Sequence, residues 1–328
     1  TFLRTGPFTI YTSILLFNHE MSATIRRTRN IQYSPVGDDN EVVDELVADD
    51  GAKCCGYYSF QVINIAAAIL HGVNALVMAI VYFANDKEDR LYAIPTPYSA
   101  WVPNNASLPE GDRTYTIETK TTTTLLSLNW LIFSFHLLSF VFQMFAAATD
   151  LFEKGLCKYK YTAMIESGRN PLRFIEYALS ASIMLVCIAL VSGIRSWTDL
   201  SAIVLLNVYT QLMGLACEYV RRKWVLNFAH VTAWVTIVAA YGIIIAYTVT
   251  SITANEVDPP SFVYAIITLQ VLLFMSFGFV QLFQLYCNFR YSELAYTVLS
   301  LVAKTILGYM IYANVLVGMG RVTEAIVE

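Results

Sequence analysis

The stretch that decides the fold lies near the carboxyl end of the chain. Residues 293–317 read ELAYTVLSLVAKTILGYMIYANVLV, and Lys304 is the only charged residue between Leu294 and Val317. About 20 mainly apolar residues suffice for a helix to cross the ~30 Å hydrocarbon core of a bilayer. The stretch is therefore long enough to span a membrane. It carries a lysine where a charge costs about 2.5 to 3.5 kcal/mol on insertion scales.

Six further apolar stretches of similar length precede this one. The chain of 328 residues is 56% hydrophobic and only 14% charged, which is typical of membrane proteins. Because helices satisfy their own backbone hydrogen bonds in lipid, the pattern predicts an all-α membrane protein with a seven-helix transmembrane bundle. The expected spans are residues 57–84, 124–148, 172–194, 199–217, 225–250, 260–286 and 293–317.

The segments outside the spans define the predicted domain organisation. Residues 1–56 change from basic to acidic and are expected to form a flexible cytoplasmic tail, residues 57–317 the seven-helix domain, and residues 318–328 an outside tail. In the first outer loop, about residues 86–123, two stretches rich in Tyr, Thr and Ile flank a run of turn-forming residues. This pattern predicts a β-hairpin.

The distribution of Lys and Arg predicts the orientation of the bundle. On the side of the amino-terminal tail there are 14 of these residues, among them Arg173 in the second-to-third loop, and 6 lie on the other side. Cytoplasmic loops carry the excess of basic residues. The amino terminus is therefore expected to be cytoplasmic and the carboxy terminus outside, in a protein integral to a cellular membrane.

One carboxylate is placed to meet Lys304. Glu176 is the only charged residue between Phe174 and Ile194, in the third span. With this topology the third and seventh helices run in the same direction. Glu176 lies about 5 residues into its helix and Lys304 about 10 into its own, an offset of roughly 7 Å at 1.5 Å per residue. Side chains lean towards the start of their helix, so the two groups are expected to meet.

The residues alone leave two interpretations of this pair open. One is a structural ion pair that joins two helices, in a transporter or a membrane scaffold that needs no ligand. The other is a desolvated lysine whose neutral amine attacks an aldehyde, with Glu176 as counterion of the protonated product. In both cases Ser300, one turn before Lys304, faces the same space as a hydrogen-bond partner.

Two motifs resemble those of one family of retinal proteins. Residues 173–184, RFIEYALSASIM, and residues 300–304, SLVAK, are similar to the heliorhodopsins, and the similarity extends over all seven spans. It implies a rhodopsin-like bundle of inverted orientation with all-trans retinal in the dark. It also implies Lys304 as the attachment site through a Schiff base and Glu176 as its counterion. The Schiff-base neighbours that it implies are Tyr177, Ser180 and Ser300.

The resemblance further implies a polar cluster on the cytoplasmic side. Glu218 and His71 match a glutamate and a histidine of the family. A second family histidine departs from the pattern: if Ser139 is the motif serine, its partner four residues later is Gln143. His136, one turn before Ser139, is the alternative.

Glu218 has a second interpretation that needs no such cluster. It is a helix-end pair with Arg221 or Arg222, three and four residues later.

Three further residues are candidates for the walls of a retinal pocket. Phe274 and Gln281 lie seven residues apart and therefore share a helix face, and Trp234 lies in the preceding span. Simple packing in the bundle is the other interpretation of these side chains.

The resemblance implies a light-sensing photoreceptor, since the family is generally associated with slow photocycles and no active pumping. The sequence adds that no complete proton relay is visible in the outer half of the bundle. One alternative is light-gated passive proton conduction, in which some viral members of the family are implicated. The other is the retinal-free transporter or scaffold. The expected partners are retinal, the lipid bilayer, a second copy in a homodimer implied by resemblance, and an unidentified cytoplasmic signalling partner. Neither a nucleotide-binding loop nor a nucleophilic triad is present, so we expect no enzyme, no catalytic or metal site and no nucleic acid.

Overall fold

The computed structural model describes residues 60–84, 91–104, 107, 109, 114–151, 161–220, 222–254, 259–284 and 289–316. Both expected tails, residues 1–56 and 318–328, lie outside these ranges. Seven of the described helices are long and apolar enough to cross a membrane. They are α2 (Phe60–Ala84), α3 (Leu128–Leu151), α5 (Pro171–Val191), α6 (Trp197–Tyr219), α7 (Lys223–Ala254), α8 (Ser261–Gln284) and α9 (Phe289–Ile311). The protein is therefore an integral membrane protein with the predicted seven-helix bundle.

The boundaries of the predicted spans agree with the helices to within a few residues, with two differences. The second span was expected to begin at residue 124, but residues 124–127 belong to a strand and α3 begins at Leu128. A short helix, α4 (Tyr161–Glu166), precedes α5 and was not predicted, because six residues are too few for a periodic pattern. After Ile311, α9 continues as a π-helix, η2 (Tyr312–Leu316).

The predicted β-hairpin is present between the first two membrane helices. Strands β1 (Leu91–Pro103) and β2 (Tyr115–Ser127) pair antiparallel, with Trp101 opposite Ile117. Near the bundle, Ile94 is fully buried and contributes to the core. The guanidinium of Arg195, just before α6, lies 4.2 Å from the ring centroid of Tyr92. The foot of the hairpin is thus packed on the bundle, whereas Trp101 and Ile117 are exposed.

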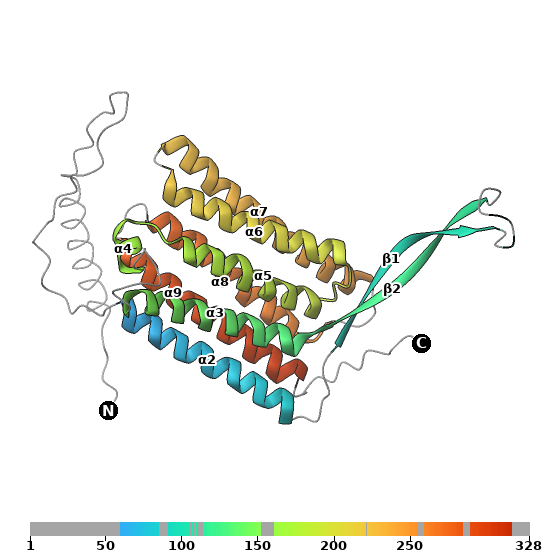
Figure 1. Cartoon of the computed structure of the whole chain (residues 1–328), viewed down its shortest axis with the longest axis horizontal. Coiled ribbons are helices and arrows are strands. Elements are labelled where there is room, and N and C mark those ends of the chain that lie inside the picture. Colours follow the sequence, from blue (N-terminus) through green and yellow to red (C-terminus); the bar gives the residue numbers. More distant parts are fainter. Residues whose placement is uncertain are drawn as a thin grey trace, which may run out of the picture. The chain divides into compact units, whose positions relative to one another are not determined.

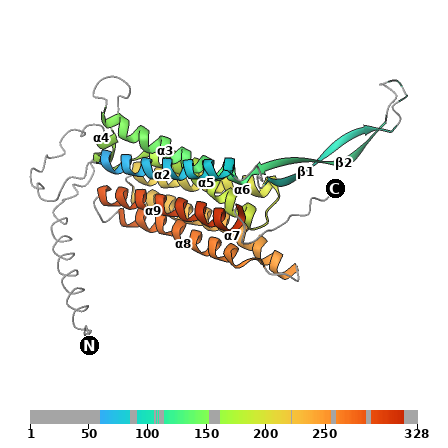
Figure 2. The ribbon, with the colours of Figure 1, turned by 90° about the horizontal axis from the view of Figure 1, so that it is seen from below.

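Helix α5 is the most buried of the seven membrane helices: 67% of its apolar window is buried, against 22% to 39% for the others. It lies between α3 and α6 and also contacts α8, whereas α2 packs against α3 and α9 (Figures 1 and 2). A charged side chain on α5 therefore faces protein. We call the end of the bundle where α4 lies beside the starts of α5 and α9 the base, and the end that carries β1 and β2 the hairpin end (Figure 1).

The start of α5 is specified by its sequence. Asn170 is the N-cap, and its side chain accepts a hydrogen bond from the backbone N–H of Arg173, while Pro171 occupies the first helical position. At the other end, Gly193 adopts a φ of 94° and its N–H donates to the carbonyl of Leu190. These capping contacts set where α5 begins and ends, and therefore the position of Glu176 along the bundle axis.

Candidate functional site

Lys304 is buried in the middle of the bundle and its ammonium group has three acceptors. Nζ donates to Glu176 Oε1 at 2.7 Å, to Ser139 Oγ at 2.5 Å and to Ser300 Oγ at 2.9 Å. An ammonium group has three N–H donors, so its hydrogen-bonding capacity is used completely. The structure thus brings together Lys304, Glu176 and Ser300, the three residues that the sequence placed on facing helices.

Ser139 on α3 joins this group and was not predicted as a site residue. Its hydroxyl accepts from Lys304 and donates to Glu176 Oε1 at 2.7 Å. Ser139 is fully buried and supplies a neutral bridge between the two charges. One signal for Ser139 was present in the sequence, namely its match to a family motif serine. The contact itself spans 165 residues along the chain.

The other two expected neighbours of the amine differ in their surroundings. The ring of Tyr177 lies 5.3 Å from Lys304 Nζ, and its hydroxyl donates to the backbone carbonyl of Tyr296 at 3.0 Å. Ser180 is fully buried, and among the described residues its hydroxyl has no hydrogen-bond partner. Tyr177 is therefore part of the Lys304 surroundings, whereas Ser180 makes no hydrogen bond to the charged pair.

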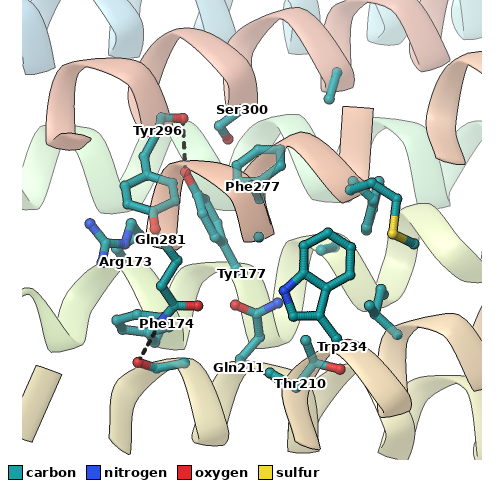
Figure 3. Close-up of a pocket in the computed structure, with 18 of the residues that line it drawn as sticks. Arg173, Phe174, Tyr177, Thr210, Gln211, Trp234, Phe277, Gln281, Tyr296 and Ser300 are labelled. Atoms are coloured by element: carbon teal, nitrogen blue, oxygen red, sulfur yellow. Dashed lines mark hydrogen bonds between the residues drawn. The ribbon is translucent and has the colours of Figure 1, made fainter. Parts of the chain in front are cut away.

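A cavity opens beside Lys304. With its mouth it contains about 800 Å³ of free space, and its wall is mostly apolar, as is usual for sites that bind small organic molecules. The wall includes Trp234, Phe274 and Gln281, the three expected pocket residues. Figure 3 shows Tyr177, Phe277 and Trp234 around this space. The lining residues that the sequence did not single out include Ala181, Met184, Gln211, Met275, Phe277 and Tyr296.

Aromatic rings from four helices, α5, α7, α8 and α9, form much of the cavity wall. The ring of Phe277 lies edge-on to Tyr177 at 5.4 Å between centroids and is stacked on Tyr296 at 6.1 Å. The indole of Trp234 donates to His230 Nε2 at 3.0 Å. Such edge-to-face and offset contacts are the preferred arrangements of aromatic pairs. These contacts restrict the positions of the rings, so the cavity has a defined shape.

At the base, a second buried charge cluster surrounds Arg173. Its guanidinium forms ion pairs with Glu218 on α6 and Glu293 on α9, and all three side chains are at most 4% exposed. Arg173 was counted with the second-to-third loop, and this is corrected by its position in the first turn of α5, buried between α6 and α9. Glu293 was not among the predicted site residues.

The interpretation of Glu218 changes as well. Glu218 forms an ion pair with Arg173, 45 residues earlier on a neighbouring helix. A pattern at i+3 and i+4 gives no signal for such a partner. Arg221 lies outside the described residues, so a helix-end pair with it stays a prediction.

The four residues expected to form one polar cluster do not do so. His71 and His136 contact each other, with 3.4 Å between their Nδ1 atoms, and His136 lies beside Gly308, one turn beyond Lys304 towards the hairpin end. Gln143 instead lines a cavity at the base together with Arg173 and Glu293. His136 and Gln143 are seven residues apart on α3, about 10 Å along the axis. Along the bundle axis, Lys304 therefore lies between the histidine pair and the base cluster.

The comparison with known families decides which kind of site this is. The family model described as heliorhodopsin matches residues 60–316. The chain belongs to the heliorhodopsin family. Membership together with the seven-helix fold supports a retinal-binding, light-responsive rhodopsin, so the predicted family and fold are confirmed. No curated protein sequence matches the chain.

Solved rhodopsins share the fold of this heliorhodopsin at low sequence identity. The light-driven proton pump CsR of Coccomyxa subellipsoidea matches with a TM-score of 0.54 and 14% identity, over 78% of this chain and 96% of the pump. The thermophilic rhodopsin of Rubrobacter xylanophilus gives 0.54 and 11%, over 78% and 95%. The transmembrane and linker region of a Salpingoeca rosetta rhodopsin phosphodiesterase gives 0.53 and 12%, over 77% and 70%.

The residues present fit the retinal that the heliorhodopsin family implies. The cavity is largely apolar and has the Lys304 amine in its wall beside the carboxylate of Glu176. Two glycines widen it: a Cβ at Gly214 would lie 2.6 Å from the ring of Phe174, and one at Gly278 would lie 2.6 Å from Trp234. An apolar chain with an aldehyde at one end matches such a space.

Proposed function

We propose that the protein is a light sensor in which Lys304 carries retinal as a protonated Schiff base, with Glu176 as the counterion. The observation that supports this most strongly is the position of the Lys304–Glu176 pair, 2.7 Å apart, at the wall of an aromatic-lined cavity. A structural ion pair alone would not require that cavity. Removing one partner of a buried pair leaves an uncompensated charge, which is strongly disfavoured.

The side chains of the protein have distinct tasks in this proposal. The amine of Lys304 condenses with the aldehyde and releases water. Glu176 then balances the positive charge that remains on the nitrogen, and Ser139 keeps the Glu176 carboxylate oriented through its hydrogen bond at 2.7 Å. Trp234, Phe274 and Gln281 bound the space for the chain of the chromophore. Retinal, when bound, supplies visible absorption and a light-driven isomerisation.

The signal follows from electrostatics. Illumination moves the positive charge at Lys304 relative to Glu176. The hydrogen bonds to Ser139 and Ser300 then no longer fit the new position of that charge. Three helices, α3, α5 and α9, meet at this point. A local change in charge can therefore shift their packing between two states.

A sensor is favoured over a pump by the apolar packing beyond the His71–His136 pair. Further towards the hairpin end, Ile311 and Val315 on α9 are buried within the hydrophobic core. Light-gated passive proton conduction is the second candidate, and the polar cavity at the base that includes Glu176 favours it. The phosphodiesterase in the name of one structural neighbour belongs to that protein, and our proposal includes no enzymatic activity.

The charge distribution supports a cytoplasmic base in this proposal, with the hairpin end outside. Three further parts of the proposal rest on family membership. They are the all-trans chromophore in the dark, a homodimer and a cytoplasmic signalling partner. Retinal extraction with chromatographic isomer analysis, and the mass of the detergent-solubilised protein, test the first two.

The decisive experiment adds all-trans retinal to the purified protein. Wild type is expected to develop a visible absorption band, and Lys304→Ala is expected to lack it, while Lys223→Ala, at the exposed start of α7, retains it. A band in Lys304→Ala, or none in wild type, contradicts the proposal. Photocurrents under voltage clamp separate the two candidates: currents that reverse with the proton gradient indicate conduction, and their absence supports the sensor.

A further inference from the structure

The buried charges between Lys304 and the base do not balance. Lys304 and Arg173 are basic, whereas Glu176, Glu218 and Glu293 are acidic, and each of these side chains is at most 5% exposed. With all five ionised, the group carries one uncompensated negative charge. In an interior of low dielectric constant such a charge is strongly disfavoured, and a buried group neutralises instead.

Other titratable side chains at the described part of the base do not supply the missing positive charge. Tyr161 on α4 and Tyr296 on α9 are phenols, which are neutral at pH 7. Glu166 and Arg290 form their ion pair at the surface. The guanidinium of Arg169 lies over the ring of Tyr219 at 4.7 Å. A bound proton is therefore the simplest way to balance the buried group.

The hydrogen bonds indicate which carboxyl group holds this proton. Glu218 accepts from Arg173, from the backbone N–H of Asn170 at 2.7 Å and from Gln284 at 3.2 Å. Several donors to one carboxylate favour its ionised form. Glu176 likewise accepts from two donors, Lys304 and Ser139.

Glu293 is less well provided with donors. Its Oε2 accepts from the Asn170 amide at 2.8 Å. Its Oε1 pairs with Arg173, a cation that it shares with Glu218. Of the two carboxyl groups that share Arg173, Glu293 has fewer other donors and is therefore the one that the surroundings stabilise less as an anion.

A polar cavity connects Glu293 with the counterion. Both Glu176 and Glu293 line it, together with Gln143, Asn170 and Thr297. About 20 Å³ of it is open to the centre of a water-sized sphere, and roughly 10 to 15 Å³ on this measure suffices for one buried water with several polar partners. The cavity therefore has the size and the lining for a bound water in the space that the two carboxyl groups share.

We propose that Glu293 binds a proton in the dark protein and passes it through this cavity to Glu176 after illumination. The dark site follows from the charge balance and the hydrogen bonds, and the transfer rests on the proposed function. When the positive charge at Lys304 moves away, the Glu176 carboxylate loses its partner. The O–H bond of Glu293 then breaks and one forms at Glu176, while Glu293, now a carboxylate, keeps its contact with Arg173. No electron is transferred.

Infrared spectroscopy of the retinal-free protein at neutral pH tests the dark site. Wild type is expected to show the C=O stretch of a buried protonated carboxyl group, with a shift in D₂O, and Glu293→Gln is expected to lose it. Glu218→Gln is expected to lose it as well, because Arg173 then has Glu293 as its only anion. The exposed Glu166→Gln is the matched control and keeps the band. Persistence of the band in Glu293→Gln or Glu218→Gln contradicts the site.

Light-minus-dark infrared spectra of the retinal-loaded protein test the transfer. Wild type is expected to show a negative carboxyl band from Glu293 and a positive one from Glu176, and Glu293→Gln lacks the negative band. A normal visible band combined with a wild-type spectrum without the negative band overturns the transfer, while the proposed function stands. Absence of the visible band overturns the proposed function instead. Should Glu293→Gln not fold, the wild-type dark spectrum decides, since a missing carboxyl band overturns the site.

Discussion

The indole of Trp234 on α7 fills the space that a side chain at Gly278 on α8 would need. A Cβ at position 278 would lie 2.6 Å from Cζ2 and 2.8 Å from Cε2 of the ring, closer than Cβ atoms approach other atoms in proteins. Trp234 is also held by the hydrogen bond to His230 and an edge contact with Phe279 at 5.1 Å. The glycine therefore sets the position of one wall of the cavity.

Replacement of this glycine tests whether the cavity binds the chromophore. Gly278→Ala is expected to push the indole into the cavity and to slow the appearance of the visible band several-fold after retinal is added, because a rigid ring cannot yield cheaply in a packed interior. Gly242→Ala on α7 is the control, since nothing lies within 4 Å of its Cβ position. Equal rates of band formation in the two variants would show that the chromophore lies elsewhere.

Two buried serines test which residues are neighbours of the Schiff base. The structure places Ser139 beside Lys304, whereas the resemblance implies Ser180. Ser139→Ala removes the bridge between Lys304 and Glu176, so the absorption maximum of the retinal-bound protein is expected to shift. Ser180→Ala removes a hydroxyl without a hydrogen-bond partner among the described residues and is expected to leave the maximum unchanged. Absorption spectra at equal pH provide the measurement. A shift in Ser180→Ala alone would reverse the assignment.

The sequence was sufficient for the fold and for the Lys304–Glu176 pair. Apolar length determines a membrane helix, and the levels of two parallel helices follow from counting residues at 1.5 Å each. The contact of Ser139 was beyond such counting, because it depends on how α3 is rotated about its own axis. Hydrophobic periodicity indicates that rotation poorly when lipid and protein interior are both apolar.

The base cluster was missed for a different reason. Arg173 and Glu293 lie within the first turns of α5 and α9, where a charged residue in a sequence is ordinarily interpreted as solvated. Their burial depends on α4, whose residue Tyr161 packs with Phe289 at the start of α9. Glu218 was recognised, as a member of a polar cluster or as a helix-end partner of Arg221 or Arg222. Arg173 was not considered as its partner, because it was counted with the loop before the third span.

Asn170 is expected to be among the most sensitive residues at the base. Besides capping α5, its side chain donates to Tyr161 at 3.2 Å and to Glu293 at 2.8 Å. Asn170→Ala removes the cap and leaves buried acceptors unsatisfied, which together cost about 2 to 4 kcal/mol and lower the thermal unfolding temperature by several degrees. Ser196→Ala removes the part-buried cap of α6 and is expected to cost about 1 kcal/mol. A smaller loss in Asn170→Ala than in Ser196→Ala would contradict this ranking.

The stability of the base is expected to fall at alkaline pH because of Tyr161. Burial raises the pKa of its phenol from 10.0 to about 12. The unfolded chain therefore releases this proton from about pH 10 and the folded protein only near pH 12. Stability falls across this window, by about 3 kcal/mol for a difference of two pKa units. Thermal unfolding in detergent between pH 9 and about 12 measures the fall.

Two variants provide the controls. In Tyr161→Phe the loss of stability that comes from this phenol is expected to be absent, whereas Tyr115→Phe on the exposed hairpin keeps it. An unchanged pH profile in Tyr161→Phe would assign the alkaline loss of stability to other groups.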